Sequence, residues 1–259
     1  MASASVARHG LTPLEAAMLR RYFRAVFGDQ QSGDRLVAAL APRLPAGDGT
    51  VVSLFTQATR TWRKMHVDDC APAFSARTVI DVLSPGQAVE RQAGVLIDVF
   101  GLSVDQAATV LDRSAGEVVR LLSATRRGRQ TPIGKSVLVV EDEPLIAQHL
   151  AQLARKAGAG IVTMARSYDE AMTAAQASPP DIVLCDYDLG AGKTGTDVVR
   201  TLSAEYDTLA IFVTAYPNEV LTGSEHEPSF IISKPFRDDV VRAALYFAAT
   251  TIRPELLAA

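Results

Sequence analysis

The chain has 259 residues, a formal net charge of −3 and 48% apolar residues, which is enough to build two ordinary globular domains. No apolar run is long enough to cross a membrane, the first ten residues do not resemble a signal peptide, and the two cysteines provide neither a disulfide framework nor a metal cluster. These features argue against a membrane-spanning or secreted protein and predict a cytoplasmic one.

Three amphipathic helices are predicted in the first part of the chain. The first, residues 12–28, begins with a capping threonine and a proline and ends in a glycine, and its apolar residues recur at helical spacing. The other two are predicted over residues 32–44 and 50–64, on either side of a loop rich in proline and glycine.

Three further helices are predicted over residues 85–100, 104–111 and 115–126. Ser103 and Ser114 stand at the capping positions of the second and third. A short helix, a tight turn and a longer helix form a helix-turn-helix, whose last helix normally enters the major groove of DNA.

The segment Leu19–Ala25 and the helix-turn-helix resemble regions 2 and 4 of extracytoplasmic-function sigma factors. The resemblance implies an all-helical, sigma-like domain over residues 1–127. Its region-2-like part is expected at residues 12–64 and its region-4-like part at residues 84–127, with a linker at residues 128–135.

The last helix of this module differs from its sigma relatives in the residues that would hold DNA. Val119 and Leu121 stand where sigma factors typically carry a lysine and an arginine, and Glu117 adds negative charge near the helix start. Because affinity for DNA depends largely on Lys and Arg contacts to phosphate, this helix is better suited to a protein partner than to DNA. The candidate partner-binding residues are Leu19, Tyr22, Val119, Leu121 and Leu122.

The second half of the chain alternates apolar strands with helices. Strands are predicted over residues 137–140, 160–165, 182–186, 209–214 and 229–233. Short loops between strands and helices predict a five-stranded parallel sheet of flavodoxin-like topology, covered on both faces. The two halves also differ in charge, with 16 basic and 12 acidic residues before position 131 and 10 and 17 after it, so they could dock on each other.

Four of these strands end in polar residues. The first runs into Glu141 and Asp142, the third ends at Asp186, the fourth ends at Thr214, and the fifth is followed by Lys234. Each residue alone also has a structural explanation, such as a turn or an acidic helix start. Together they provide a carboxylate nucleophile, acids suited to Mg²⁺, a hydroxyl and an ammonium, which phosphoryl transfer to a carboxylate requires.

On these residues, the segment 136–259 resembles the receiver domain of two-component response regulators. The resemblance implies that Asp186 is the phosphoacceptor and that Mg²⁺ is held by Glu141, Asp142, Asp186 and the backbone carbonyl of Asp188. Glu141 departs mildly from the family, which often has aspartate at that position.

The same resemblance assigns the remaining strand-end residues. It implies that Thr214 and Lys234 bind the phosphoryl group and that Tyr216 reorients on activation together with Thr214. In this family the peptide between Lys234 and Pro235 is usually cis.

A sigma-like module that precedes a receiver resembles the PhyR-type general stress response regulators of alphaproteobacteria. The resemblance implies a phosphorylation-controlled anti-anti-sigma factor rather than an enzyme. A sensor histidine kinase or a phosphotransfer protein would phosphorylate Asp186, and the sigma-like half would then sequester a NepR-type anti-sigma factor without binding DNA or membrane.

Two other functions stay open. A receiver joined to a helix-turn-helix is also typical of DNA-binding transcriptional regulators, although residues 117–122 have little basic character. Asp186-Tyr187-Asp188 resembles the Asp-x-Asp motif of haloacid-dehalogenase-type phosphatases, but the acidic pair precedes it here, which inverts the order found in that family.

Overall fold

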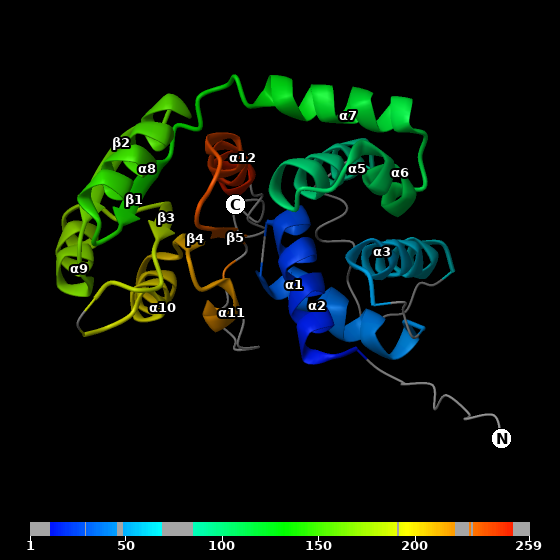
Figure 1. Ribbon diagram of the computed structural model, residues 1–259, viewed down its shortest axis with the longest axis horizontal. Helices are drawn as coiled ribbons and strands as arrows, with labels where there is room; N and C mark the ends of the chain where they lie inside the picture. The colour runs from blue at the N-terminus through cyan, green and yellow to red at the C-terminus, as the bar shows by residue number, and fades with distance from the viewer. Residues whose placement is uncertain are drawn as a thin grey trace, which may run out of the picture.

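The computed structural model shows a helical half and an α/β half that lie side by side, with helix α7 running along the helical half toward the other (Figure 1). The structure describes residues 11–28, 30–45, 49–68, 85–190, 192–220, 228 and 230–250. The start of the predicted region-4-like part at residue 84 and the end of the chain beyond residue 250 therefore lie outside the described residues.

The elements of the helical half follow the sequence prediction closely. They are α1 (Pro13–Phe27), α2 (Gln30–Leu40), η1 (Ala41–Arg43), α3 (Val51–Asp68), α5 (Pro85–Gly94), η2 (Val95–Val99), α6 (Val104–Leu111) and α7 (Ala115–Gly128). Thr12, Ser103 and Ser114 each form a capping box at the start of a helix, which satisfies backbone donors that would otherwise lack a partner. The predicted helix over residues 85–100 is continuous, but its second part, η2, is a π-helix.

The second half contains the predicted five-stranded parallel sheet, in the order β2-β1-β3-β4-β5. Its elements are β1 (Ser136–Val140), α8 (Pro144–Lys156), β2 (Ile161–Ala165), α9 (Tyr168–Ala177), β3 (Ile182–Cys185), α10 (Gly195–Tyr206), β4 (Leu209–Thr214), α11 (Pro217–Val220), β5 (Phe230–Ser233) and α12 (Asp238–Ala249). This order is the flavodoxin-like one, so the predicted topology is confirmed.

Helices cover both faces of the sheet, so the central strands β1 and β3, whose successive side chains point to opposite sides, are buried on both faces. Val137 and Val139 of β1 join the apolar cluster formed with α8 and α12, whereas Leu138 and Val140 join the cluster formed with α9 and α10. The first of these clusters continues without a break into the core of the helical half, where it includes Leu19. The two halves therefore share one apolar core on the α12 side of the sheet.

The halves dock through α12 and β5, which pack on η2 and α1 (Figure 1). The charge distribution suggested that the halves could dock, and two hydrogen bonds between them run from arginines of the helical half to backbone carbonyls of the α/β half. Arg21 of α1 donates to the carbonyl oxygen of Ile231 at 3.0 Å, and Arg91 of α5 donates to the carbonyl oxygen of Phe247 at 2.6 Å.

The predicted linker at residues 128–135 is fixed at both ends. Helix α7 extends to Gly128, and the next residue, Arg129, pairs with Asp98 of η2. Further on, the amide of Ile133 donates to the carbonyl of Ala157 at 3.0 Å, so this stretch is hydrogen-bonded to the end of α8.

Candidate functional site

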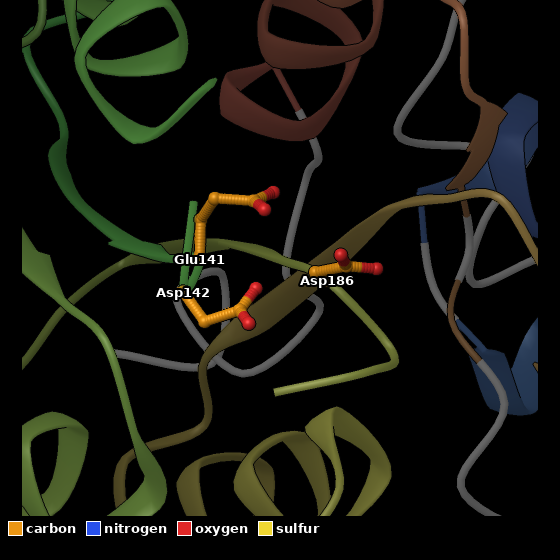
Figure 2. A group of neighbouring side chains, drawn as sticks. All are labelled: Glu141, Asp142 and Asp186. Atoms are coloured by element: carbon orange, nitrogen blue, oxygen red, sulfur yellow. The ribbon is translucent and has the colours of Figure 1, made fainter. Parts of the chain in front are cut away.

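Three carboxylates meet at the carboxyl ends of β1 and β3 (Figure 2). In the parallel register of these strands Val140 pairs with Cys185, which places the residues that follow them next to each other. As a result, Glu141, Asp142 and Asp186 each offer an oxygen within 4.8 Å of the others. The sequence prediction that these acids come together is confirmed.

Lys234, which follows β5, reaches two of the acids. Its Nζ donates to Oδ2 of Asp186 at 2.7 Å and to Oε1 of Glu141 at 3.0 Å. Burial lowers the pKa of this ammonium, but the hydrogen bonds that it donates to Asp186 and Glu141, with the charges of both acids, outweigh burial, and the net pKa is raised. The ammonium therefore stays charged and holds the two carboxylates at fixed positions.

Glu141 adds a second buried carboxylate beside Lys234. The residue is fully buried, and burial raises its pKa to about 7 despite the neighbouring Lys234. Its Oε2 lies 2.9 Å from Nζ of Lys234 but has no hydrogen-bond partner among the described residues. A cluster of three carboxylates, one of which has a buried oxygen without a hydrogen bond among the described residues, fits a small, hard metal cation.

Thr214 and Tyr216 lie at the same edge of the sheet, and in the described part of the chain their side chains form no hydrogen bond with the three acids. Thr214 is fully buried, and its Oγ1 accepts a hydrogen bond from the amide of Tyr216 at 3.0 Å. The side chain of Tyr216 is 51% exposed, and its ring centroid lies 6.4 Å from that of Tyr187. The backbone of Lys234 connects the fourth and fifth strand ends, because its amide donates to the Thr214 carbonyl at 2.8 Å.

The loop after β3 fixes the Asp186 side chain through its neighbours. The amide of Tyr187 donates to Oδ1 of Asp186 at 2.6 Å, and the amide of Gly195 donates to the Tyr187 carbonyl at 2.8 Å. Asp188 is exposed, and its own carboxylate accepts a hydrogen bond from the amide of Gly190. The role of its backbone carbonyl as a metal ligand stays a prediction.

Sequence reasoning missed Gly195, which begins α10 directly behind Asp186. A Cβ at this position would lie 1.8 Å from the carbonyl oxygen of Asp186 and 2.9 Å from Sγ of Cys185. The signal was present, since a glycine at the start of a helix after a strand-end acid often marks a close backbone approach.

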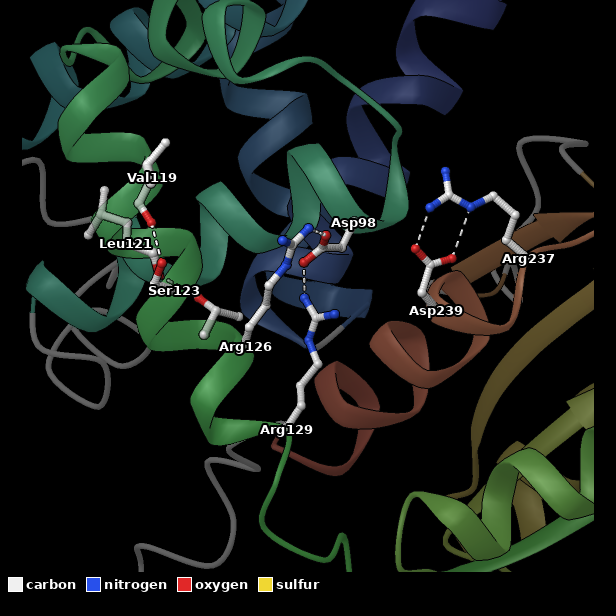
Figure 3. A network of polar contacts seen from close by, with 9 residues as sticks. Asp98, Val119, Leu121, Ser123, Arg126, Arg129, Arg237 and Asp239 are labelled. Atoms are coloured by element: carbon white, nitrogen blue, oxygen red, sulfur yellow. Dashed lines mark hydrogen bonds and ion pairs between the residues drawn. The ribbon is translucent and has the colours of Figure 1, made fainter.

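The candidate partner-binding residues divide into buried and accessible ones. Leu19 and Tyr22 have no exposed surface and lie in the core, where the ring of Tyr22 stacks on Phe55 at 4.7 Å. Leu122 is also buried, whereas Val119 on α7 is 49% exposed (Figure 3). In this arrangement Leu19, Tyr22 and Leu122 stabilise the core, and their role in binding a partner stays a prediction.

Within the described part of the chain, every helix is too short or too polar to cross a membrane.

Comparisons with known proteins agree with this geometry. The model of the response regulator receiver domain family matches residues 137–246. Nearly the whole chain is similar to the phyllosphere-induced regulator PhyR of Methylorubrum extorquens, with 34% identity over 253 residues, which cover 92% of this chain and 94% of that relative.

Two solved structures share the complete architecture. The response regulator PhyR from Brucella abortus has 30% identity and a TM-score of 0.72, with 92% of this chain and 94% of that chain covered. The anti-anti-sigma factor PhyR from Bartonella quintana has 28% identity and a TM-score of 0.72, with 91% and 92% covered. The strand-end site, the order of the two halves and the extent of these matches show that the chain belongs to the PhyR family of response regulators.

Proposed function

We propose that this chain is a phosphorylation-controlled anti-anti-sigma factor that sequesters a NepR-type anti-sigma factor. The observation that carries the proposal is the position of Asp186. Lys234 holds this residue at one edge of the sheet, and the nearby elements β5 and α12 pack on the helical half. The Bartonella quintana relative bears the name anti-anti-sigma factor, and a further structure shows that protein complexed with the anti-sigma factor NepR.

Asp186 accepts the phosphoryl group from a sensor histidine kinase or a phosphotransfer protein. Mg²⁺ fits the acids Glu141, Asp142 and Asp186, and when bound it neutralises charge on the acids and on the transferred phosphoryl oxygens. Lys234 supplies a second cation at the same carboxylate. The Thr214 hydroxyl can donate to the phosphoryl group, because the hydrogen bond between its oxygen and the Tyr216 amide is one that it accepts.

The reaction is regulatory rather than metabolic. Beyond phosphorylation of Asp186 and slow loss of the phosphoryl group, we expect no turnover of substrates. The protein acts in the cytoplasm, and the weakly basic helix α7 serves protein recognition and not DNA binding.

The closed arrangement of the two halves is the resting state in this proposal. The sigma-like domain covers residues 1–127, the linker residues 128–135 and the receiver residues 136–259. When Thr214 moves toward the phosphoryl group, Tyr216 turns inward and the face formed by β5 and α12 changes shape. A switch from mostly closed to mostly open requires a bias of up to about 5.5 kcal/mol, which charge-assisted hydrogen bonds and a metal can supply.

The test is the affinity for the anti-sigma factor, measured by calorimetry with and without a phosphodonor. Wild-type protein and the control Asp169→Asn, which changes an exposed carboxylate on α9, should bind tightly only with the donor. Asp186→Asn should not respond to the donor. Donor-dependent capture by the Asp186 variant would refute the proposal, and salt-sensitive promoter binding by the phosphorylated protein would favour a DNA-binding regulator instead.

A further inference from the structure

Arg91 on α5 lies buried at the point where three elements meet, with 8% of its surface exposed. Its Nε donates to the carbonyl oxygen of Ala25 on α1 at 2.9 Å. Its Nη2 donates to the carbonyl oxygen of Phe247 on α12 at 2.6 Å, and its Nη1 donates to Oγ1 of Thr250 at 2.9 Å. One guanidinium therefore joins both parts of the helical half to the receiver.

Both carbonyl acceptors of Arg91 belong to the last turn of a helix. Ala25 is among the final four residues of α1, and Phe247 is among the final four of α12, where carbonyls lie beyond the regular intrahelical pattern and can accept from other donors; the Phe247 carbonyl also accepts from Oγ1 of Thr250 at 3.5 Å. A cation at a helix C-terminus also opposes the helix dipole. In the described part of the chain no carboxylate pairs with Arg91, and burial lowers its pKa to about 10, which leaves it charged at neutral pH.

The receiver's contribution to this contact is centred on Phe247. Two guanidinium groups lie over its ring, with the Cζ atoms of Arg91 and Arg129 at 5.1 and 5.6 Å from the ring centroid. Gly94 provides the room, because a Cβ there would lie 2.7 Å from Cζ of Phe247. Arg129 is held in turn by Asp98 of η2, which also pairs with Arg126 of α7 (Figure 3).

We propose that Arg91 is the residue that couples the position of α12 to the packing of α1 against α5. The inference rests on the proposed function, in which α12 leaves the helical half after phosphorylation. When α12 leaves, Arg91 loses two of its three hydrogen bonds and the ring of Phe247 together. The guanidinium is then drawn toward water, and its remaining bond to Ala25, which ties the region-2-like part to the region-4-like part, breaks with it.

Backbone acceptors make this coupling sensitive to small displacements. A carboxylate side chain could follow a moving guanidinium by rotation, whereas the carbonyl of Phe247 moves only with the helix that carries it. Helix α12 begins at Asp238, a few residues after Lys234, so a change at the phosphorylation site reaches Arg91 through one short connection. A hydrogen bond at 2.6 Å weakens steeply when its geometry is distorted.

The experiment is hydrogen-exchange mass spectrometry on the full chain, with the variant Arg91→Met and the control Arg35→Met, which changes an exposed arginine of α2. Methionine keeps an unbranched apolar stem in place of the arginine stem and removes the guanidinium donors. In Arg91→Met, without any phosphodonor, exchange at the end of α12 and at the end of α1 should accelerate by on the order of tenfold or more. The control should match wild type, and α6 should keep its protection in all three proteins.

A second variant keeps the test decisive if Arg91→Met fails to fold. Gly94→Ala leaves Arg91 intact, but its Cβ would lie 2.7 Å from Cζ of Phe247 and 2.7 Å from Cγ2 of Thr125, both buried, so the Phe247 ring and the helix that carries it must shift. It should accelerate exchange at the end of α1 as well as at α12, because the coupling runs through Arg91. Acceleration confined to α12 would overturn the coupling, as would wild-type exchange in a folded Arg91→Met.

A third arm separates this inference from the proposed function. Beryllofluoride, which mimics the phosphoryl group, should accelerate exchange at α12 in wild-type protein and add little in Arg91→Met. If wild-type protein does not respond to beryllofluoride, the proposed function fails, whereas the effect of Arg91→Met on the resting protein still decides the coupling.

Discussion

Replacing Gly195 with alanine should damage the phosphorylation site through a backbone clash. The added Cβ would lie 1.8 Å from the Asp186 carbonyl oxygen, whereas ordinary contact begins at 3.4 Å. Because this neighbour is backbone, α10 and the end of β3 must separate by about 1.6 Å. Overpacking of this kind costs about 3 kcal/mol, and a shift of that size at a reacting carboxylate reduces the rate by about a hundredfold.

Two measurements check this prediction. Urea unfolding gives the loss of stability, and labelling by acetyl phosphate with Mg²⁺ gives the rate of phosphorylation. Gly160→Ala is the matched control in the receiver, since its Cβ would meet only the Gly134 carbonyl at 3.5 Å. If Gly195→Ala unfolds within about 0.5 kcal/mol of wild type and is labelled at the normal rate, the close approach described here does not position Asp186.

Three more predictions concern charge. Burial raises the pKa of Glu141 to about 7, so below that pH a proton competes with the metal for this carboxylate. The affinity for Mg²⁺, measured by calorimetry, should therefore fall about tenfold from pH 8 to pH 6. An affinity that does not change with pH would contradict this prediction. Lys234→Ala should still be phosphorylated at Asp186 but should lose donor-dependent anti-sigma binding in a pull-down, because the ammonium no longer links β5 to that carboxylate; unchanged switching would rule out its role. Asp34→Ala should cost about 2 kcal/mol in thermal unfolding, because the fully buried Arg24 loses the two charge-assisted hydrogen bonds that it donates to this carboxylate, and a loss below about 0.5 kcal/mol would refute that estimate.

The sequence was sufficient for the features that depend on local patterns. Capping residues such as Ser103 marked helix starts, and apolar strands that end in Glu141, Asp186 and Lys234 predicted which side chains would meet. These predictions succeeded because the carboxyl ends of parallel strands share one edge of the sheet.

Features that depend on packing between distant segments could not be predicted in this way. Leu19 and Tyr22 lie on an apolar helix stripe, and a stripe that faces another helix has the same spacing as one that faces a partner. Arg91 resembled any other arginine of an amphipathic helix, because its acceptors lie 66 and 156 residues away in the sequence. The π-helix η2 likewise has no spacing signal that separates it from an α-helix.

The contact between Arg21 and the carbonyl of Ile231 has a consequence for the activated protein. Strand β5 is the last strand of the sheet, and α1 lies beside its outer side. Once the halves separate, this strand presents unpaired backbone groups to solvent, which is the usual template for strand addition between molecules. Activated molecules that are in excess over their binding partner should therefore associate with one another through β5. The amount of that partner would then determine how long an activated molecule stays monomeric.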